Sequence, residues 1–161
     1  MNGEFAERFE GRNLDLICIL QPEPLLIRAD SRRIWRVLEN LYVNVCKYAM
    51  PGTRVYVDAI KKDGKIQLSI KNISENPLNF QADELTERFI RGDVSRSTEG
   101  SGLGLSIAKN LTVLQHGSFN IYLDGDLFKV TITFDEAVKE KKPMPPMIVP
   151  EAVQEEAQQD A

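Results

Sequence analysis

Three glycines alternate with other residues in the segment 100–104 (GSGLG), and an apolar stretch with helical spacing follows it directly. Glycine allows the backbone to approach a ligand closely and to adopt dihedral angles that other residues avoid. The start of a helix offers unpaired N–H groups and the positive end of the helix dipole, which favour an anion such as phosphate. The segment is therefore expected to fold as a loop that leads into a helix and holds a phosphate-bearing ligand.

A second predicted helix, upstream of the glycine run, carries polar side chains that suit the same ligand. Apolar residues recur with helical spacing between residues 31 and 49, and Asp30 or Ser31 is the expected N-cap. Asn40, Asn44 and Lys47 lie on nearly the opposite face. Two asparagines one turn apart are costly inside a helix, because their amides compete for backbone hydrogen bonds. An amide oxygen can bind Mg²⁺ and an ammonium group can meet phosphates, so this face is a candidate nucleotide site.

Composition excludes several other classes of protein. The chain has 161 residues, of which 42% are hydrophobic, and this is enough for one domain with a core. A net charge of −4 gives no electrostatic case for nucleic-acid binding. No apolar stretch is long enough to span a membrane, and no signal peptide opens the chain. Cys18 and Cys46 lie in apolar contexts and are expected to be buried free thiols, which favours a reducing, cytoplasmic location.

The order of predicted elements indicates an α+β fold. A helix end is expected at residues 4–10, a short helix at 83–89, a loop at 91–102 and a helix from about 103 to Gln115 with Gly117 as its C-cap. Strands are expected at residues 14–20, 25–29, 53–60, 65–71, 118–123 and 127–134, and Asp63-Gly64 predicts a hairpin turn. This order predicts a two-layer α/β sandwich, with helices on one face of a mixed, mainly antiparallel sheet.

Three segments resemble the motifs of one family, the ATP-binding domain of sensor histidine kinases. Residues 39–49 (ENLYVNVCKYA) are similar to its asparagine box, residues 87–93 (ERFIRGD) to its phenylalanine box and residues 99–111 (EGSGLGLSIAKNL) to its second glycine box. The resemblance covers about residues 13–134. The wider superfamily includes gyrase-type topoisomerases, the heat-shock chaperone ATPase and mismatch-repair ATPases. It implies an ATP sandwich of helices on a sheet with a flexible lid.

The resemblance implies a role for each matching residue. Asn44 would ligate Mg²⁺, Asn40 would lie beside the phosphates of ATP, and Lys47 would neutralise their charge. The remaining expected ATP-binding residues line the nucleotide pocket, anchor the lid or let its backbone wrap the phosphates: Tyr48, Asn72, Phe89, Arg91, Gly100, Gly102, Leu103, Gly104 and Leu105.

Two departures from the family pattern limit what the resemblance implies. The first glycine box, in which an Asp reads the adenine amino group, is replaced by residues 71–76 (KNISEN), with Asn72 at the Asp position. An Asn oxygen can still accept a hydrogen bond from adenine, but without the charge of a carboxylate, so weaker binding is expected. The only histidine, His116, ends a predicted helix and is interpreted as a helix C-terminal residue, not as a phosphoacceptor.

The position of Asn40 decides between transfer and hydrolysis. Phosphoryl transfer needs mainly positioning and charge neutralisation, whereas hydrolysis also needs a base that orients water. In the hydrolases of the superfamily a glutamate stands one turn before the Mg²⁺ asparagine; here that position is Asn40, and Glu39 projects about 100° away around the helix. The prediction is a histidine kinase catalytic domain. A degenerate interaction module without nucleotide binding, and a hydrolytic ATPase of the same superfamily, stay open as alternatives.

The implied organisation places the phosphoacceptor outside the chain. Residues 1–12 would be the last turns of a dimerisation and phosphoacceptor helix, residues 13–136 the ATP-binding catalytic domain, and residues 137–161 a disordered tail rich in Pro, Glu and Gln. The implied partners are the histidine-bearing dimerisation domain of the parent kinase and a response regulator. No contact of this chain with nucleic acid or membrane is expected, although the parent kinase could be membrane-anchored.

Overall fold

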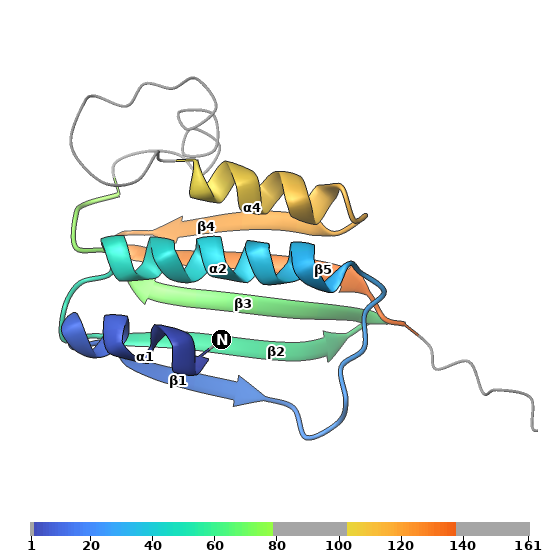
Figure 1. Ribbon diagram of the computed structural model, residues 1–161, viewed down its shortest axis with the longest axis horizontal. Helices are drawn as coiled ribbons and strands as arrows, with labels where there is room; N and C mark the ends of the chain where they lie inside the picture. Colours follow the sequence, from blue (N-terminus) through green and yellow to red (C-terminus); the bar gives the residue numbers. More distant parts are fainter. Residues whose placement is uncertain (1, 79–102, 138–161) are drawn as a thin grey trace, which may run out of the picture.

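A computed structural model describes residues 2–78 and 103–137 of the chain. Five strands form one sheet in the order β1-β2-β3-β5-β4, and the described helices lie together on one face of it (Figure 1). Strands β1 and β2 are parallel, and every other neighbouring pair is antiparallel. The elements are α1 (Asn2–Gly11), β1 (Asp15–Leu20), α2 (Ser31–Tyr48), β2 (Arg54–Lys62), β3 (Lys65–Ile73), α4 (Gly104–Val113), β4 (Ser118–Asp124) and β5 (Leu127–Asp135). This architecture confirms the predicted α+β sandwich with a mixed, mainly antiparallel sheet.

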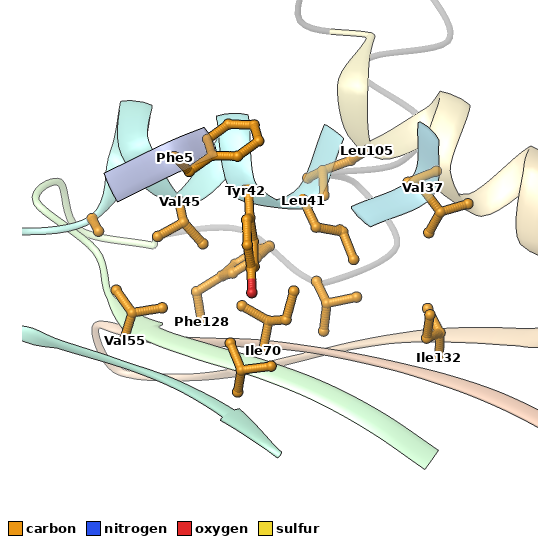
Figure 2. Packing of buried hydrophobic residues seen from close by; sticks show 14 of the residues in the cluster. Phe5, Val37, Leu41, Tyr42, Val45, Val55, Ile70, Leu105, Phe128 and Ile132 are labelled. Carbon is orange, nitrogen blue, oxygen red and sulfur yellow. The ribbon is translucent and has the colours of Figure 1, made fainter. Parts of the chain in front are cut away.

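Helix α2 is the central element of the helical layer. Its apolar face, which includes Val37, Leu41 and Val45, packs onto core residues of the sheet such as Ile70 and Val55 (Figure 2). The helical spacing of its apolar residues and its N-terminal boundary both agree with the prediction from the sequence. The Asp30 carboxylate accepts hydrogen bonds from the backbone N–H groups of Arg32 and Arg33 at 2.9 and 3.1 Å. The hydrogen bond from Arg33 is the main cause that holds the pKa of Asp30 below its usual range.

Helix α1 packs on the other side of α2 from α4 through aromatic side chains. The rings of Phe5 and Phe9 meet the ring of Tyr42 edge-on, with centroids 5.4 and 5.6 Å apart. All three residues are buried. Burial of three aromatic side chains contributes strongly to the packing of a short helix that could not persist alone. The start of the chain is thereby tied to the middle of α2.

Two hairpins join neighbouring strands, and the one at Asp63-Gly64 confirms the predicted turn. Asp63 and Gly64 both have positive φ, 51° and 71°, as the two central residues of a tight turn between β2 and β3 require. The antiparallel register of β2 and β3 pairs Lys62 with Lys65 next to this turn. The second hairpin joins β4 to β5 and turns at Gly125, which has φ of 55°.

Some sequence predictions were wrong. Residues 25–29 do not form a strand; only Ile27 pairs, in a single antiparallel bridge with Glu136. This segment crosses the end of the sheet after two prolines, where the backbone N–H of Ala137 bonds to Leu26. Strand β3 continues through Asn72 and Ile73, two residues beyond the predicted end of the strand at residue 71. Cys18 is exposed and not buried, because β1 is an edge strand. Cys46 is half-buried, and neither cysteine forms a disulfide.

The end of α4 differs from the prediction in one residue. His116, not Gly117, adopts the left-handed conformation, with φ of 63°. The N–H groups of His116 and Gly117 donate to the carbonyls of Val113 and Thr112 at 2.9 and 3.0 Å, which is the Schellman pattern of helix termination. Gly117 is required for a different reason, which is that a side chain at this position would clash. A Cβ there would lie 2.6 Å from the ring of Phe134.

Candidate functional site

Helices α2 and α4 meet where the asparagine-bearing segment faces the end of the glycine run. A Cβ on Gly104, in the first turn of α4, would lie only 3.3 Å from the side-chain oxygen of Asn40. The amide nitrogen of Asn40 donates to the carbonyl of Arg36 at 2.7 Å, so its N–H is used within α2. The structure therefore brings together two motifs that are far apart in the sequence.

The C-terminal half of α2 presents the other polar residues of the site. Asn44 is half-buried, lies one turn after Asn40, and its side chain makes no hydrogen bond with any described residue. Lys47 is exposed, and its ammonium group lies 5.0 Å from the ring centroid of the half-buried Tyr48. A neutral amide and a lysine on one helical face can bind a divalent cation and an anion side by side.

Asn72 lies on β3 with its side chain on the helical face of the sheet, since its partner in the register is the core residue Phe128. Asn72 is 3% exposed, and its Nδ2 donates to the carbonyl of Ile73 at 3.1 Å. Because a carbonyl only accepts, the NH₂ end of the amide must face it. The Oδ1 atom is buried and has no hydrogen-bond partner among the residues that the structure describes. An orphaned buried acceptor is costly unless a ligand supplies a donor.

Backbone hydrogen bonds hold the end of β3 against the end of α2. The N–H of Met50 donates to the carbonyl of Ile73 at 2.8 Å, and the N–H of Glu75 donates to the carbonyl of Tyr48 at 2.8 Å. Ala49 and Ser74 form an antiparallel bridge between these two bonds. The orphaned acceptor of Asn72 is therefore fixed beside the end of α2 that carries Lys47 and Tyr48.

The remaining predicted residues fall into two groups. Leu103 is exposed and is the N-cap residue of α4, where no described side chain makes a capping hydrogen bond. Leu105 is 3% exposed and belongs to the hydrophobic core (Figure 2). Uncapped N–H groups at a helix start remain available to an anion. The predicted ATP-binding residues Phe89, Arg91, Gly100 and Gly102, with the expected short helix at 83–89 and loop at 91–102, lie outside the described residues.

Glu39, the carboxylate nearest to Asn40 in sequence, is engaged elsewhere. Its side chain accepts from Nη1 of Arg36 at 3.2 Å. Within residues 2–78 and 103–137, no group of three His, Cys, Asp or Glu side chains is arranged to hold a metal ion. None of the described helices is long and apolar enough to cross a membrane.

A pocket that no sequence pattern predicted lies on the opposite face of the sheet. A cavity of about 270 Å³ is lined by Arg54, Tyr56, Lys71, Asn72, Ile73 and Leu127. Tyr56 and Lys71 are paired in the register and alternate with the core residues Val55 and Ile70, so they point away from the helices. The Lys71 ammonium is ion-paired with Asp58 at 2.9 Å. This pocket lies behind Asn72 and is separate from the site between α2, α4 and β3.

Comparisons with known proteins agree with this geometry. The family described as histidine kinase-, DNA gyrase B-, and HSP90-like ATPase matches residues 29–138. The signal transduction histidine-protein kinase BaeS of Escherichia coli is 32% identical over 117 residues, which cover 71% of this chain and 25% of BaeS. The sensor histidine kinase WalK of Bacillus subtilis is 31% identical over 144 residues, which cover 84% of this chain and 23% of WalK. The chain thus spans about a quarter of the length of these relatives.

A solved structure with the same fold is the catalytic domain of the histidine kinase ThkA. It superposes with a TM-score of 0.70 at 23% sequence identity, and the match covers 84% of this chain and 87% of that domain. At this level of identity the likeness concerns the fold.

Proposed function

The chain belongs to the family of histidine kinase-, DNA gyrase B- and HSP90-like ATPases, and we propose that it delivers phosphate from Mg-ATP to a histidine on a separate domain. Its curated relatives are sensor histidine kinases, and it is an ATP-binding catalytic domain of that type. In the proposed pathway the phosphohistidine of the parent kinase then donates its phosphoryl group to a response regulator. The reaction takes place in the cytoplasm, and the parent kinase is the part of the system that senses the signal.

The observation that carries the proposal is the buried, unpaired Oδ1 of Asn72. Adenine presents an exocyclic amino group, which is the donor that this oxygen lacks. Because Nδ2 is turned toward the Ile73 carbonyl, Oδ1 is the amide atom that is left without a described partner and can accept from a base. A base with a carbonyl oxygen in place of the amino group would place that oxygen against Oδ1 of Asn72, and two acceptors cannot form a hydrogen bond. Asn72 can therefore replace the family aspartate in adenine recognition without carrying a negative charge.

The phosphate end of the site is proposed to lie between α2 and α4. Asn44 is the proposed Mg²⁺ ligand, because its half-buried amide has no described hydrogen-bond partner. Lys47 would neutralise phosphate charge, and the uncapped N-terminus of α4 beside Asn40 would donate N–H groups to phosphate oxygens. Mg²⁺, when bound, supplies charge neutralisation and orientation of the phosphate chain.

Transfer to another nucleophile is favoured over hydrolysis. Asn40 cannot accept a proton, and its amide N–H already bonds to Arg36. The Glu39 carboxylate is paired with the Arg36 guanidinium. Neither side chain is arranged as a base for an attacking water, whereas phosphoryl transfer to a histidine elsewhere asks this domain only for positioning and electrostatic stabilisation.

The domain boundaries follow from the same proposal. Helix α1, within residues 1–12, would be the last turns of the histidine-bearing helix that enters the domain, and residues 13–136 would be the catalytic domain. The aromatic packing of Phe5 and Phe9 on Tyr42 supports this arrangement, because it fixes the entering helix to α2. The predicted tail, residues 137–161, lies outside the described residues except for Ala137.

Calorimetry and a phosphotransfer assay test the function. We expect the 161-residue chain to bind ADP and ATP in the presence of Mg²⁺. We also expect it to form acid-labile phosphohistidine on a supplied histidine-bearing hairpin domain, with little phosphate release on its own. Absence of binding at millimolar nucleotide would instead support the degenerate interaction module. Sustained phosphate release by the isolated chain would support the hydrolytic ATPase.

A further inference from the structure

The side chain of Arg12 connects three segments of the chain at the base end of the site. Arg12 follows the last residue of α1, and its Nη2 donates to the backbone carbonyl of Ala49 at 2.7 Å. The same nitrogen donates to the carboxylate of Glu75 at 2.6 Å. Its Nε atom is buried, so the head group is inserted between its partners. One guanidinium group thus joins the end of α1, the end of α2 and the segment after β3.

These contacts lie next to the bonds that orient Asn72. Ala49 precedes Met50, whose N–H donates to the Ile73 carbonyl at 2.8 Å. The Ile73 carbonyl also accepts a hydrogen bond from Nδ2 of Asn72 at 3.1 Å. On the other side, Glu75 follows the bridge residue Ser74 and donates its N–H to Tyr48 at 2.8 Å. Arg12 therefore spans the two chain segments whose spacing sets the direction of the Asn72 amide.

The ion pair contributes little to global stability, because solvent screens it. The Arg12 and Glu75 side chains are 32% and 43% exposed. The contact with Ala49 is different, because Ala49 is fully buried and its carbonyl has Arg12 as its donor. A cation at this place also complements the negative end of the α2 dipole. The arrangement is suited to fixing a local geometry more than to holding the fold together.

We propose that Arg12 is a positioning residue for base recognition, which couples the end of α1 to the adenine acceptor of Asn72. The inference rests on the proposed function, because it requires that Asn72 bind the base. A displacement of α1 moves Arg12, changes the spacing between residues 48–50 and 73–75, and turns the Asn72 amide. Discrimination between bases, not only affinity, therefore depends on Arg12.

The test compares two nucleotides on the full 161-residue chain with Mg²⁺. ADP carries the amino group that pairs with an acceptor, and IDP carries an oxygen at that position. Calorimetry gives both dissociation constants for the wild type, for Arg12→Met, which keeps an apolar stem, and for Glu75→Gln, which keeps the bond from Arg12 to Ala49. Lys61→Met is the matched control, since it breaks the similarly exposed 2.7 Å pair with Glu136 at the other end of the sheet.

We expect Arg12→Met to weaken ADP binding about tenfold, the size of one lost hydrogen bond, and IDP binding by less than about twofold. The preference for ADP should shrink in the same direction in Glu75→Gln and stay unchanged in Lys61→Met. An equal loss for both nucleotides, or an unchanged preference, overturns the inference. If thermal melting shows that Arg12→Met is unfolded, Glu75→Gln decides alone. If the wild type itself binds no ADP, the proposed function fails and the inference fails with it.

Discussion

The side-chain oxygen of Asn40 lies against Gly104, 3.3 Å from the place where a Cβ on that glycine would stand. This contact joins the middle of α2 to the first turn of α4. It exists because Asn40 turns its amide nitrogen back to the carbonyl of Arg36, which leaves the oxygen facing α4. The last glycine of the run is thus used for close approach of a polar side chain to a helix N-terminus, which is where the proposed phosphate site lies.

Gly104→Ala tests this contact. Alanine gains up to about 1 kcal/mol of helix propensity over glycine, and the added methyl group meets the Asn40 oxygen, so the free energy of unfolding should change by less than about 1 kcal/mol. Nucleotide affinity should fall, because the methyl group displaces Asn40 from the start of α4. Thermal melting and calorimetry with Mg-ADP measure the two effects. An unchanged affinity would show that Gly104 has only a structural role.

Asn44→Asp tests the metal assignment. The half-buried amide has no described partner, so the fold and melting temperature should stay unchanged. The carboxylate adds a negative charge beside the phosphates and should impair use of Mg-ATP. The matched control is Asn110→Asp, the same change at an exposed position of α4. Calorimetry with and without Mg²⁺, together with phosphotransfer, gives the readout. Wild-type behaviour of Asn44→Asp in both assays would make the metal assignment wrong.

Asn72→Leu should separate stability from binding. Without a donor from a ligand, the buried Oδ1 costs about 1–3 kcal/mol, and an apolar side chain of similar size removes that cost. The Ile73 carbonyl keeps its bond from Met50. We expect an equal or higher melting temperature of the nucleotide-free protein and at least about tenfold weaker ADP binding. A strongly destabilised variant that still binds ADP would show that Asn72 is a structural residue.

Local patterns explain how much of the fold could be predicted. The apolar stripe of α2, the Asp30 cap and the Asp63-Gly64 turn each depend on residues close in sequence, and all three are observed. The errors depend on strand order. The apolar neighbours of Cys18 in the sequence predict a buried strand residue. It is exposed because β1 is at the edge of the sheet. Residues 25–29 have strand composition, but they lie at the end of the sheet, where Ile27 forms a single β-bridge with Glu136.

The same distinction applies to the candidate site. The approach of Asn40 to Gly104 was foreseeable, because both lie in segments whose composition pointed to the same ligand. The orientation of the Asn72 amide and the contacts of Arg12 could not be predicted from the sequence. Each depends on contacts between segments that are distant in sequence. No local sequence signal marks the half-buried Arg12 as the residue that closes such a bridge.

Gly117→Ala is expected to destabilise the fold without touching the site. A Cβ at this position would lie 2.6 Å from the Phe134 ring and 2.9 Å from the Thr112 methyl group, both of them buried residues. Overpacking of this kind costs about 1–3 kcal/mol of unfolding free energy in urea titrations. His116→Gly is the opposite control, because it relieves a left-handed non-glycine residue and should stabilise by about 0.5–1 kcal/mol. A neutral Gly117→Ala would mean that the Phe134 ring moves freely.

Tyr42 should make the stability of the fold fall at alkaline pH. Burial, with a smaller effect from the Cys18 thiolate, raises the pKa of Tyr42 from 10.0 to about 12. The folded state therefore holds this proton more tightly than the unfolded state. The resulting stability is fully present below pH 10 and is lost as the pH rises through about 12. Tyr42→Phe should flatten this part of the curve of unfolding free energy against pH, whereas Tyr122→Phe, at a 55% exposed position, should not. Absorbance titration of tyrosinate gives an independent measurement, in which one tyrosine should ionise last in the wild type and be missing in Tyr42→Phe. Equal pH curves for the wild type and Tyr42→Phe would contradict the raised pKa.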